Sequence, residues 1–191
     1  DEFAQLMGEM AELPVQALGG CCGTTPSYIR KEIAEVRKHP FPKPTKKHHT
    51  FVTSFSTAVE IGTKPRIIGE RINPTGKKKF KEALKNHDIN YILSQGLAQE
   101  DAGADILDVN VGLPEIDEVS TLVEVVKELQ SVTGLPLQID TGNVEAIEKA
   151  MRVYNGKCML NSVNGKRETM EAIFPIVKKY GAVVVALLLD E

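Results

Sequence analysis

From residue 51 onward, short apolar runs alternate with longer segments in which apolar residues recur at helical spacing. The apolar runs predict strands near 66–69, 105–109, 136–139, 157–160 and 182–188, and the longer segments predict helices near 88–102, 116–132, 143–154 and 166–180. Single strands separated by helices are typical of βαβ units, which form a parallel sheet. No strand shows a clean polar alternation, as expected when both faces of the sheet are covered.

Residues 1–39 follow a different pattern, in which a helix, a strand, a turn and a second helix are predicted. The first helix covers 3–12, the strand covers 15–18, and the second helix begins after Thr25-Pro26-Ser27 and reaches about Lys38. This unit is too small to bury a core of its own. The chain opens directly in a helix and ends as a strand is completed, so we expect an internal piece of a longer protein.

Residues 40–50 separate these two patterns. Three prolines within the first five positions keep this segment extended and prevent a helix. Its lysines and histidines are interpreted as a solvated linker and not as a binding patch. The predicted organisation is therefore a first domain at 1–39, a proline-rich linker at 40–50 and a second domain at 51–191.

Composition limits the function classes. The 191 residues carry a formal net charge of -3, so nothing indicates binding to nucleic acid. The longest apolar stretch, Ala182 to Leu189, is far shorter than the ~20 residues that span a bilayer, and no membrane partner is expected. No leader sequence is recognisable. Three cysteines do not make a disulfide framework, which favours a reducing cytoplasm.

Two adjacent cysteines, Cys21 and Cys22, lie among Gly19, Gly20 and Gly23. Neighbouring thiols seldom form a disulfide with each other, but both can bind one metal ion where glycines let the backbone turn sharply. Soft thiolates favour zinc, and a catalytic zinc usually has three protein ligands. The alternative is that two small residues simply pack a turn between a strand and a helix, and the spacing alone leaves both readings open. The third cysteine, Cys158, is expected to be an inert core residue.

Polar side chains end four of the predicted strands. They are Glu70 and Asn73, Asp108 and Asn110, Asp140, and Asn161. Five strands with polar residues at their carboxyl ends predict the first five-eighths of a (β/α)8 barrel, which binds ligands at that end. A doubly wound open sheet is the alternative, but it normally has a glycine-rich phosphate loop after its first strand, and Gly69-Glu70-Arg71 is no such loop.

Carboxylates and amides in this number suit a flat, buried ligand that carries both hydrogen-bond donors and acceptors. Each residue also has a purely structural reading. The run Asp140-Thr141-Gly142-Asn143 could cap the following helix, Asn161 could shape a turn, and Asp108 could pair with Arg71. Four such residues in register on successive strands favour the binding interpretation. The lysines at 77, 78, 79 and 81 are interpreted as a solvated helix face, with contact to an acidic ligand tail as the alternative.

The run Leu-Gly-Gly-Cys-Cys-Gly-Thr-Thr-Pro at 18–26 resembles the last-strand motif of the homocysteine-binding barrels. The resemblance implies that Cys21 and Cys22 bind Zn²⁺ and that a third cysteine ligand comes from an earlier strand outside this chain. It also implies that the zinc holds homocysteine as a thiolate, which makes it a nucleophile.

Four further motifs, Ile-Gly-Glu-Arg-Ile-Asn at 68–73, Leu-Asp-Val-Asn-Val-Gly at 107–112, Ile-Asp-Thr at 139–141 and Leu-Asn-Ser at 160–162, together resemble the pterin-binding barrels, and in particular their methyltetrahydrofolate methyltransferases. The resemblance implies that Glu70, Asn73, Asp140 and Asn161 bind 5-methyltetrahydrofolate. Asp140 would also stabilise positive charge on the folate N5 and Asn161 would orient the ring, which makes both catalytic.

A zinc barrel, a short linker and a pterin barrel in this order resemble the cobalamin-dependent methionine synthases. The expected fold is α/β, with parts of two (β/α)8 TIM barrels, both incomplete. The implied reaction moves a methyl group from 5-methyltetrahydrofolate through cob(I)alamin, held on another domain or protein, to homocysteine, giving methionine. This chain alone is expected to be inactive. The alternatives are a dihydropteroate synthase-like pterin transferase, with a basic residue near Asp140, and a non-catalytic segment of a larger assembly.

Overall fold

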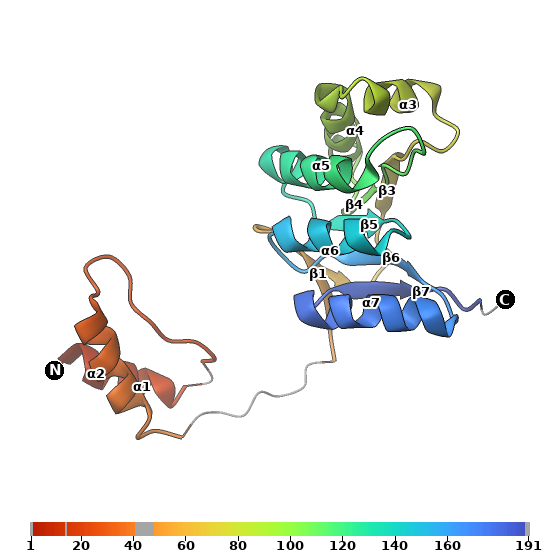
Figure 1. Cartoon of the computed structure of the whole chain (residues 1–191). Helices are drawn as coiled ribbons and strands as arrows, with labels where there is room; N and C mark the ends of the chain where they lie inside the picture. The colour runs from red at the N-terminus through yellow and green to blue at the C-terminus, as the bar shows by residue number, and fades with distance from the viewer. Residues whose placement is uncertain (1, 14, 41–47, 190–191) are drawn as a thin grey trace. The chain divides into compact units, whose positions relative to one another are not determined.

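The computed structural model describes residues 2–13, 15–40 and 48–189 (Figure 1). Contacts divide the chain into two compact units, Asp1–His48 and His49–Glu191. Most of the predicted linker, residues 41–47, lies outside the described residues, and so does the end of the chain at 190–191. The first strand of the second unit begins at Thr50, at the last position assigned to the linker.

The first unit is a pair of helices, α1 (Glu2–Ala11) and α2 (Pro26–Val36). Proline suits the first position of α2 because its missing N–H would have no partner there. Met7, Ala11 and Val36 form a small buried cluster between the helices. The predicted strand at 15–18 is wrong: these residues are irregular, and the described part of this unit contains no other strand with which they could pair.

The second unit contains a five-stranded parallel sheet in the order β3-β4-β5-β6-β7. Its strands are β3 (Ile68–Ile72), β4 (Ile106–Val109), β5 (Leu137–Asp140), β6 (Met159–Val163) and β7 (Val183–Ala186). The helices are α3 (Lys78–Lys85), α4 (Ile89–Asp101), α5 (Glu118–Val132), α6 (Val144–Val153) and α7 (Arg167–Tyr180). The predicted α/β fold with a parallel sheet is confirmed, while the arrangement of two barrels and a linker stays a prediction.

Three helices of this unit begin at a residue whose side chain caps the backbone. Asp88, Asp117 and Asn143 precede α4, α5 and α6, and the side-chain oxygen of each accepts a hydrogen bond from the first turn of its helix. Gly181 ends α7 with φ 72°, a conformation that glycine adopts without strain. None of the helices that the structure describes is long and apolar enough to cross a bilayer.

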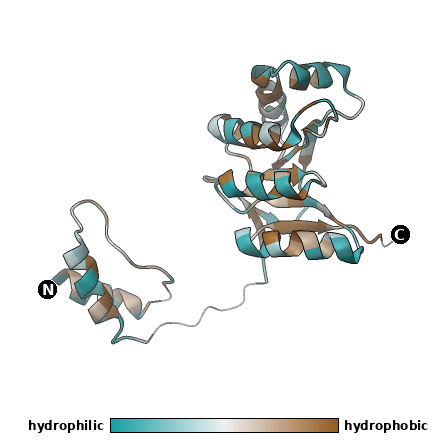
Figure 2. Ribbon diagram, in the orientation of Figure 1, coloured by the Kyte–Doolittle hydropathy of each residue, from teal (hydrophilic) through white to brown (hydrophobic). Residues whose placement is uncertain are grey.

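Alternate residues of each strand face the helices and form the main core. Leu107, Leu137, Ile139 and Leu160 pack there against residues of α5 and α6, such as Leu122, and are fully buried. Figure 2 shows hydrophobic residues concentrated in the strands, whereas the helices mix both kinds. The opposite face of the sheet, called the inner face below, is therefore free for other contacts.

An antiparallel hairpin of β1 (Thr50–Thr53) and β2 (Ala58–Ile61) precedes the sheet and was not predicted. Val52 and Val59 pack against Ile106 and Met159, which begin β4 and β6 on the inner face. The hairpin thus covers the amino ends of the strands, so the polar residues at the carboxyl ends lie at the opposite end of the inner face.

Candidate functional site

The strand register brings the predicted site residues together on the inner face. Asp108 lies beside Gln138 on the next strand, and Asp140 lies beside Asn161 on the strand after that. Asp108 and Asp140 each follow an apolar neighbour that faces the helices, so their own side chains point to the inner face. The result is two polar layers on the inner face. Asp108 lies in the lower layer, nearer the amino ends of the strands, and Asp140 lies in the upper layer, nearer their carboxyl ends.

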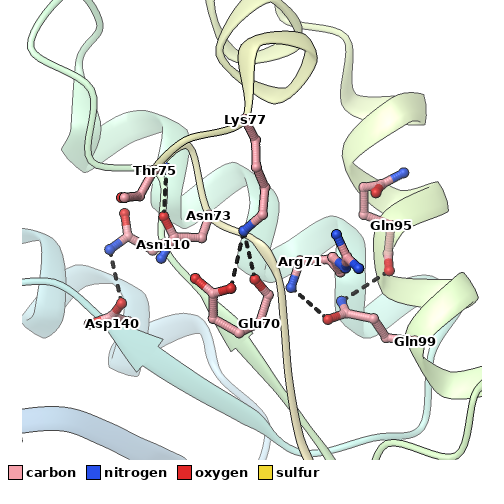
Figure 3. Close-up of polar contacts among 9 residues, drawn as sticks. All are labelled: Glu70, Arg71, Asn73, Thr75, Lys77, Gln95, Gln99, Asn110 and Asp140. Atoms are coloured by element: carbon pink, nitrogen blue, oxygen red, sulfur yellow. Dashed lines mark hydrogen bonds and ion pairs between the residues drawn. The ribbon is translucent and has the colours of Figure 1, made fainter.

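In the upper layer, Asn110 holds Asp140. The Asn110 Nδ2 donates to Asp140 Oδ2 over 2.9 Å (Figure 3). The Asn110 Oδ1 accepts from the Gly112 amide over 2.8 Å. The run Asp140-Thr141-Gly142-Asn143 does cap the following helix, but through Asn143 and not through Asp140. The carboxylate is therefore oriented by an amide that is itself fixed by the backbone, which leaves Asp140 Oδ1 without a described hydrogen-bond partner.

Asn161 completes the upper layer from β6. Its side chain is half-buried, and the peptide bond that joins it to Ser162 is cis. The strand register is interrupted between Asn161 and Val163, where β6 leaves the regular ladder with β7. Asn161 and Asp140 thus place an amide and a carboxylate side by side at the carboxyl ends of adjacent strands.

Glu70 extends the polar set to β3 and has a cationic partner. The Lys77 Nζ lies 3.0 Å from the Glu70 backbone oxygen and 3.1 Å from Glu70 Oε2 (Figure 3). Lys77 precedes α3 and does not belong to its exposed face, so the interpretation of the lysine run as a solvated helix face is incomplete at this position. The Glu70 side chain is 57% exposed and remains accessible to a ligand.

Asn73 lies near these residues but has a local structural task. It is buried, and its Oδ1 accepts from the Thr75 amide over 2.8 Å, which shapes the loop after β3. Its Nδ2 has no hydrogen bond within the described part of the chain, so Asn73 keeps donors for a ligand. The sequence motif therefore combines a loop-forming and a potential binding role in one residue.

The backbone of β3 is fixed by Gln99 of α4. The Gln99 Oε1 accepts from the Arg71 amide over 2.6 Å, and its Nε2 donates to the Gln95 carbonyl over 3.0 Å (Figure 3). Gly69 permits this close approach, since a Cβ there would lie 2.6 Å from Gln99 Oε1. A cavity of about 410 Å³ is lined by Gly69, Arg71 and Gln99 together with Glu70 and Lys77, but its lining includes none of the three residues of the upper layer.

The lower layer contains a pair that the sequence did not identify as one unit. Asp108 and Gln138 are almost fully buried, and the Gln138 Nε2 donates to Asp108 Oδ1. The alternative pairing of Asp108 with Arg71 is wrong. Burial raises the pKa of Asp108 to about 6, and repulsion from Asp140 and Glu70 adds to this rise, while the amide of Gln138 opposes it.

Cys21 and Cys22 are exposed in the turn between the helices of the first unit. The Thr24 amide donates to the Cys21 carbonyl over 2.9 Å, and Gly23 has φ 86°, so the backbone does turn sharply here. No group of three or more potential metal ligands occurs among the described residues. Cys158 is buried as predicted, and burial raises the pKa of its thiol to about 12.

A parallel α/β sheet with carboxylates and amides gathered at the carboxyl ends of its strands is the architecture of a small-molecule-binding enzyme. Residues 69–191 match the family described as "Pterin binding enzyme". The chain belongs to this family.

Two curated relatives are methionine synthases. The protein from Mycobacterium leprae (strain TN) is 33% identical over 205 residues, and the one from Mycobacterium tuberculosis (strain ATCC 25618 / H37Rv) is 32% identical over 199 residues. Each alignment covers 100% of this chain but only 17% of the relative. The resemblance to methionine synthases that the motifs predicted is confirmed, and the chain spans about a sixth of the length of these relatives.

Solved structures with a similar fold include dihydropteroate synthases. The enzyme from Vibrio fischeri ES114 has a TM-score of 0.53 at 15% identity, with 74% of this chain and 50% of that chain covered. The Yersinia pestis enzyme, in complex with a pterine-sulfa conjugate, has a TM-score of 0.51 at 19% identity, with 72% and 48% covered. At these identities the likeness concerns the fold alone.

Proposed function

We propose that residues 51–191 bind 5-methyltetrahydrofolate as part of a methyltransferase that passes the methyl group, through cobalamin on another domain or protein, to zinc-activated homocysteine and so forms methionine. The observation that carries this proposal is the pair of polar layers at the carboxyl ends of β3 to β6, in a chain that aligns over its whole length with methionine synthases. The reducing cytoplasm is the setting that its free thiols favour.

At the pterin site, each residue has a role that follows from its chemistry. The Asp140 carboxylate, oriented by Asn110, accepts from ring or amino N–H groups, and Asn161 beside it offers both a donor and an acceptor. Glu70 and Asn73 supply a further acceptor and donors from β3 and its loop. The ligand ring would thus be held edge-on by groups from three strands.

The chemical difficulty of the proposed reaction is the folate N5, which leaves poorly unless it carries positive charge. A carboxylate held close to the ring stabilises this charge as the methyl group departs. Asp140 is suited to this because its position is fixed before the ligand arrives, so little reorganisation is needed during the reaction. Cobalamin, when bound to its own domain, supplies the acceptor for the methyl group.

Cys21 and Cys22 are proposed to be two of the zinc ligands. Their thiols are exposed in a sharp turn, which fits soft donors that meet one metal ion, but two ligands do not complete a zinc site. Other ligands must come from outside the described residues. When bound, zinc would lower the pKa of a substrate thiol. We therefore propose that the chain on its own does not complete the methyl transfer to homocysteine.

Substituting Asp140 by Asn in the full chain tests the folate proposal. A hydrogen bond to a charged group contributes about 1.5–3 kcal/mol, so the affinity for 5-methyltetrahydrofolate should fall by about 10- to 150-fold. Asp117→Asn is the matched control, because Asn caps the start of α5 as well as Asp and lies outside the polar layers. Calorimetric titration at constant pH measures both variants. An unchanged affinity in the Asp140→Asn variant contradicts the assignment.

The second candidate function, a dihydropteroate synthase-like pterin transfer, requires a basic residue near Asp140. In the described residues, the hydrogen-bond partner of Asp140 is Asn110, and the nearby Lys77 pairs with Glu70. This favours the methyltransferase. Titrating the protein with 5-methyltetrahydrofolate and, separately, with a pterin pyrophosphate distinguishes the two, since preferential binding of the pyrophosphate supports the pterin transferase.

A further inference from the structure

The Asp108–Gln138 pair contains two buried oxygens that have no hydrogen-bond partner. The Gln138 Nε2 donates to Asp108 Oδ1, while Asp108 Oδ2 and Gln138 Oε1 are both buried and unpartnered within the described residues. Both of these atoms are acceptors when Asp108 is ionised, so they cannot satisfy each other. Leaving two buried acceptors without donors is costly, which requires an explanation.

A single proton on Asp108 Oδ2 removes this cost. The carboxylic acid would then donate from Oδ2 to Gln138 Oε1, while its Oδ1 continues to accept from Gln138 Nε2. A carboxyl group and a carboxamide are both planar and each carries two adjacent polar atoms, so an acid and an amide can pair through two hydrogen bonds. In this neutral form, every polar atom of the two side chains has a hydrogen-bond partner, because each donor meets an acceptor.

The charges around Asp108 also favour the neutral form. Glu70 faces it from β3 and Asp140 faces it from β5, and both repel a negative charge at Asp108. The neutral amide of Asn161 faces it from β6 and favours the charged form, although no aligned hydrogen bond joins these two side chains. Below it, Val52 and Val59 of the hairpin pack against Ile106, and the acidic residue of β2, Glu60, pairs with His49.

Lys77, the cation that contacts Glu70, does not form an ion pair with Asp108. Lys77 Nζ contacts the Glu70 carboxylate and backbone, and no ion pair of Asp108 occurs within the described residues. Burial raises the pKa of Asp108 to about 6 before any hydrogen bond from Oδ2 is considered. That hydrogen bond stabilises the protonated form and moves the pKa of Asp108 further upward.

We propose that Asp108 is a proton-holding positioning residue, paired as a neutral acid with Gln138 beneath the ligand site, so that it adds no negative charge beside Asp140. Two carboxyl groups on one face are thereby given different roles by their surroundings: the deeply buried one holds a proton, and the less buried one is left to contact the ligand. The part of the proposal that concerns the ligand rests on the proposed folate function, whereas the protonation of Asp108 does not.

Infrared difference spectroscopy of the ligand-free full chain, titrated between about pH 5 and about pH 8, tests the proposal because protonated and ionised carboxyl groups absorb at different frequencies. We expect a protonated carboxyl band that disappears with a midpoint at or above about pH 6. Asp108→Asn should abolish this band. Asp105→Asn is the matched control and should leave the band intact, since Asp105 pairs with Arg66 and its pKa is lowered, chiefly by the hydrogen bond from the Ile67 amide.

A second variant keeps the test decisive if Asp108→Asn does not fold. Gln138→Met removes the amide that donates to Asp108 Oδ1, so the carboxyl band should move to higher frequency as the C=O group loses its donor. The absence of a protonated carboxyl band from the wild-type protein at about pH 5, or a band that Gln138→Met leaves in place, overturns the proposal. Because no folate is present, these outcomes are independent of whether the protein binds folate, which calorimetric titration of the same samples measures separately.

Discussion

Tyr154 joins the hairpin to the sheet, and its removal gives a sharp prediction about the fold. The Tyr154 hydroxyl accepts from the Leu137 amide over 3.0 Å and donates to the Thr53 carbonyl over 2.8 Å. Tyr154→Phe keeps the ring but leaves both groups without this partner. Leaving the Leu137 amide unpaired costs about 1–3 kcal/mol of stability, because Leu137 is fully buried. Losing the hydrogen bond to the Thr53 carbonyl costs about 0.5–1.5 kcal/mol, because Thr53 is partly exposed. The expected loss in the free energy of unfolding is about 1.5–4.5 kcal/mol.

Urea denaturation of the full chain, followed by circular dichroism, measures this loss. Tyr91→Phe is the control: Tyr91 is half-buried in the same unit, its ring contacts Phe80, and no hydrogen bond of its hydroxyl occurs within the described residues. We expect this control to stay within about 0.5 kcal/mol of the wild type. If Tyr154→Phe is equally harmless, the hydroxyl does not connect the hairpin to β5 and the reasoning fails.

Two further predictions concern ionisable groups. Burial raises the pKa of Asp108 from 3.8 to about 6, so the folded state binds a proton that the unfolded chain has lost. The free energy of unfolding should therefore fall by about 3 kcal/mol as the pH rises from below about 4 to well above about 6, and Asp108→Asn should remove this fall in urea titrations at several pH values. In metal-free protein, a thiol reagent should modify Cys21 and Cys22 rapidly and Cys158 only after unfolding, and three rapid thiols would contradict the burial of Cys158.

The parallel sheet was predictable because its signals are local and repeated. Each strand is a short apolar run, and each of α4, α5 and α6 follows an Asp or Asn that caps it. The hairpin was missed because its strands have four residues each and contribute a single buried valine apiece, which is too little for a periodic pattern. The strand predicted at 15–18 failed for the opposite reason: an apolar run indicates a strand only if another strand is available to pair with it.

The candidate site shows the same division between local and long-range information. Glu70, Asp140 and Asn161 were found from motifs because each follows a short apolar run, and the carboxyl ends of such strands converge in a parallel sheet. Asp140 is the last residue of β5, whereas Glu70 and Asn161 lie within β3 and β6. The partnership of Asp108 with Gln138 depends on the register between two strands that are separated by a whole helix, and the sequence contains no signal for that register.

Lys77 illustrates a third case, in which composition misleads. A run of lysines favours a solvated helix face, and the lysines of α3 that follow Lys77 are exposed, as this interpretation expects. Among them, Lys79 Nζ lies over the Tyr91 ring, 4.5 Å from its centroid. Lys77 differs only because the helix begins one residue later, which leaves its side chain free to reach Glu70. A shift of one residue in the start of a helix thus decides whether a lysine side chain extends into solvent or contacts the residues of the ligand site. Sequence patterns locate helix starts less accurately than this, so charge assignments at helix ends require the structure.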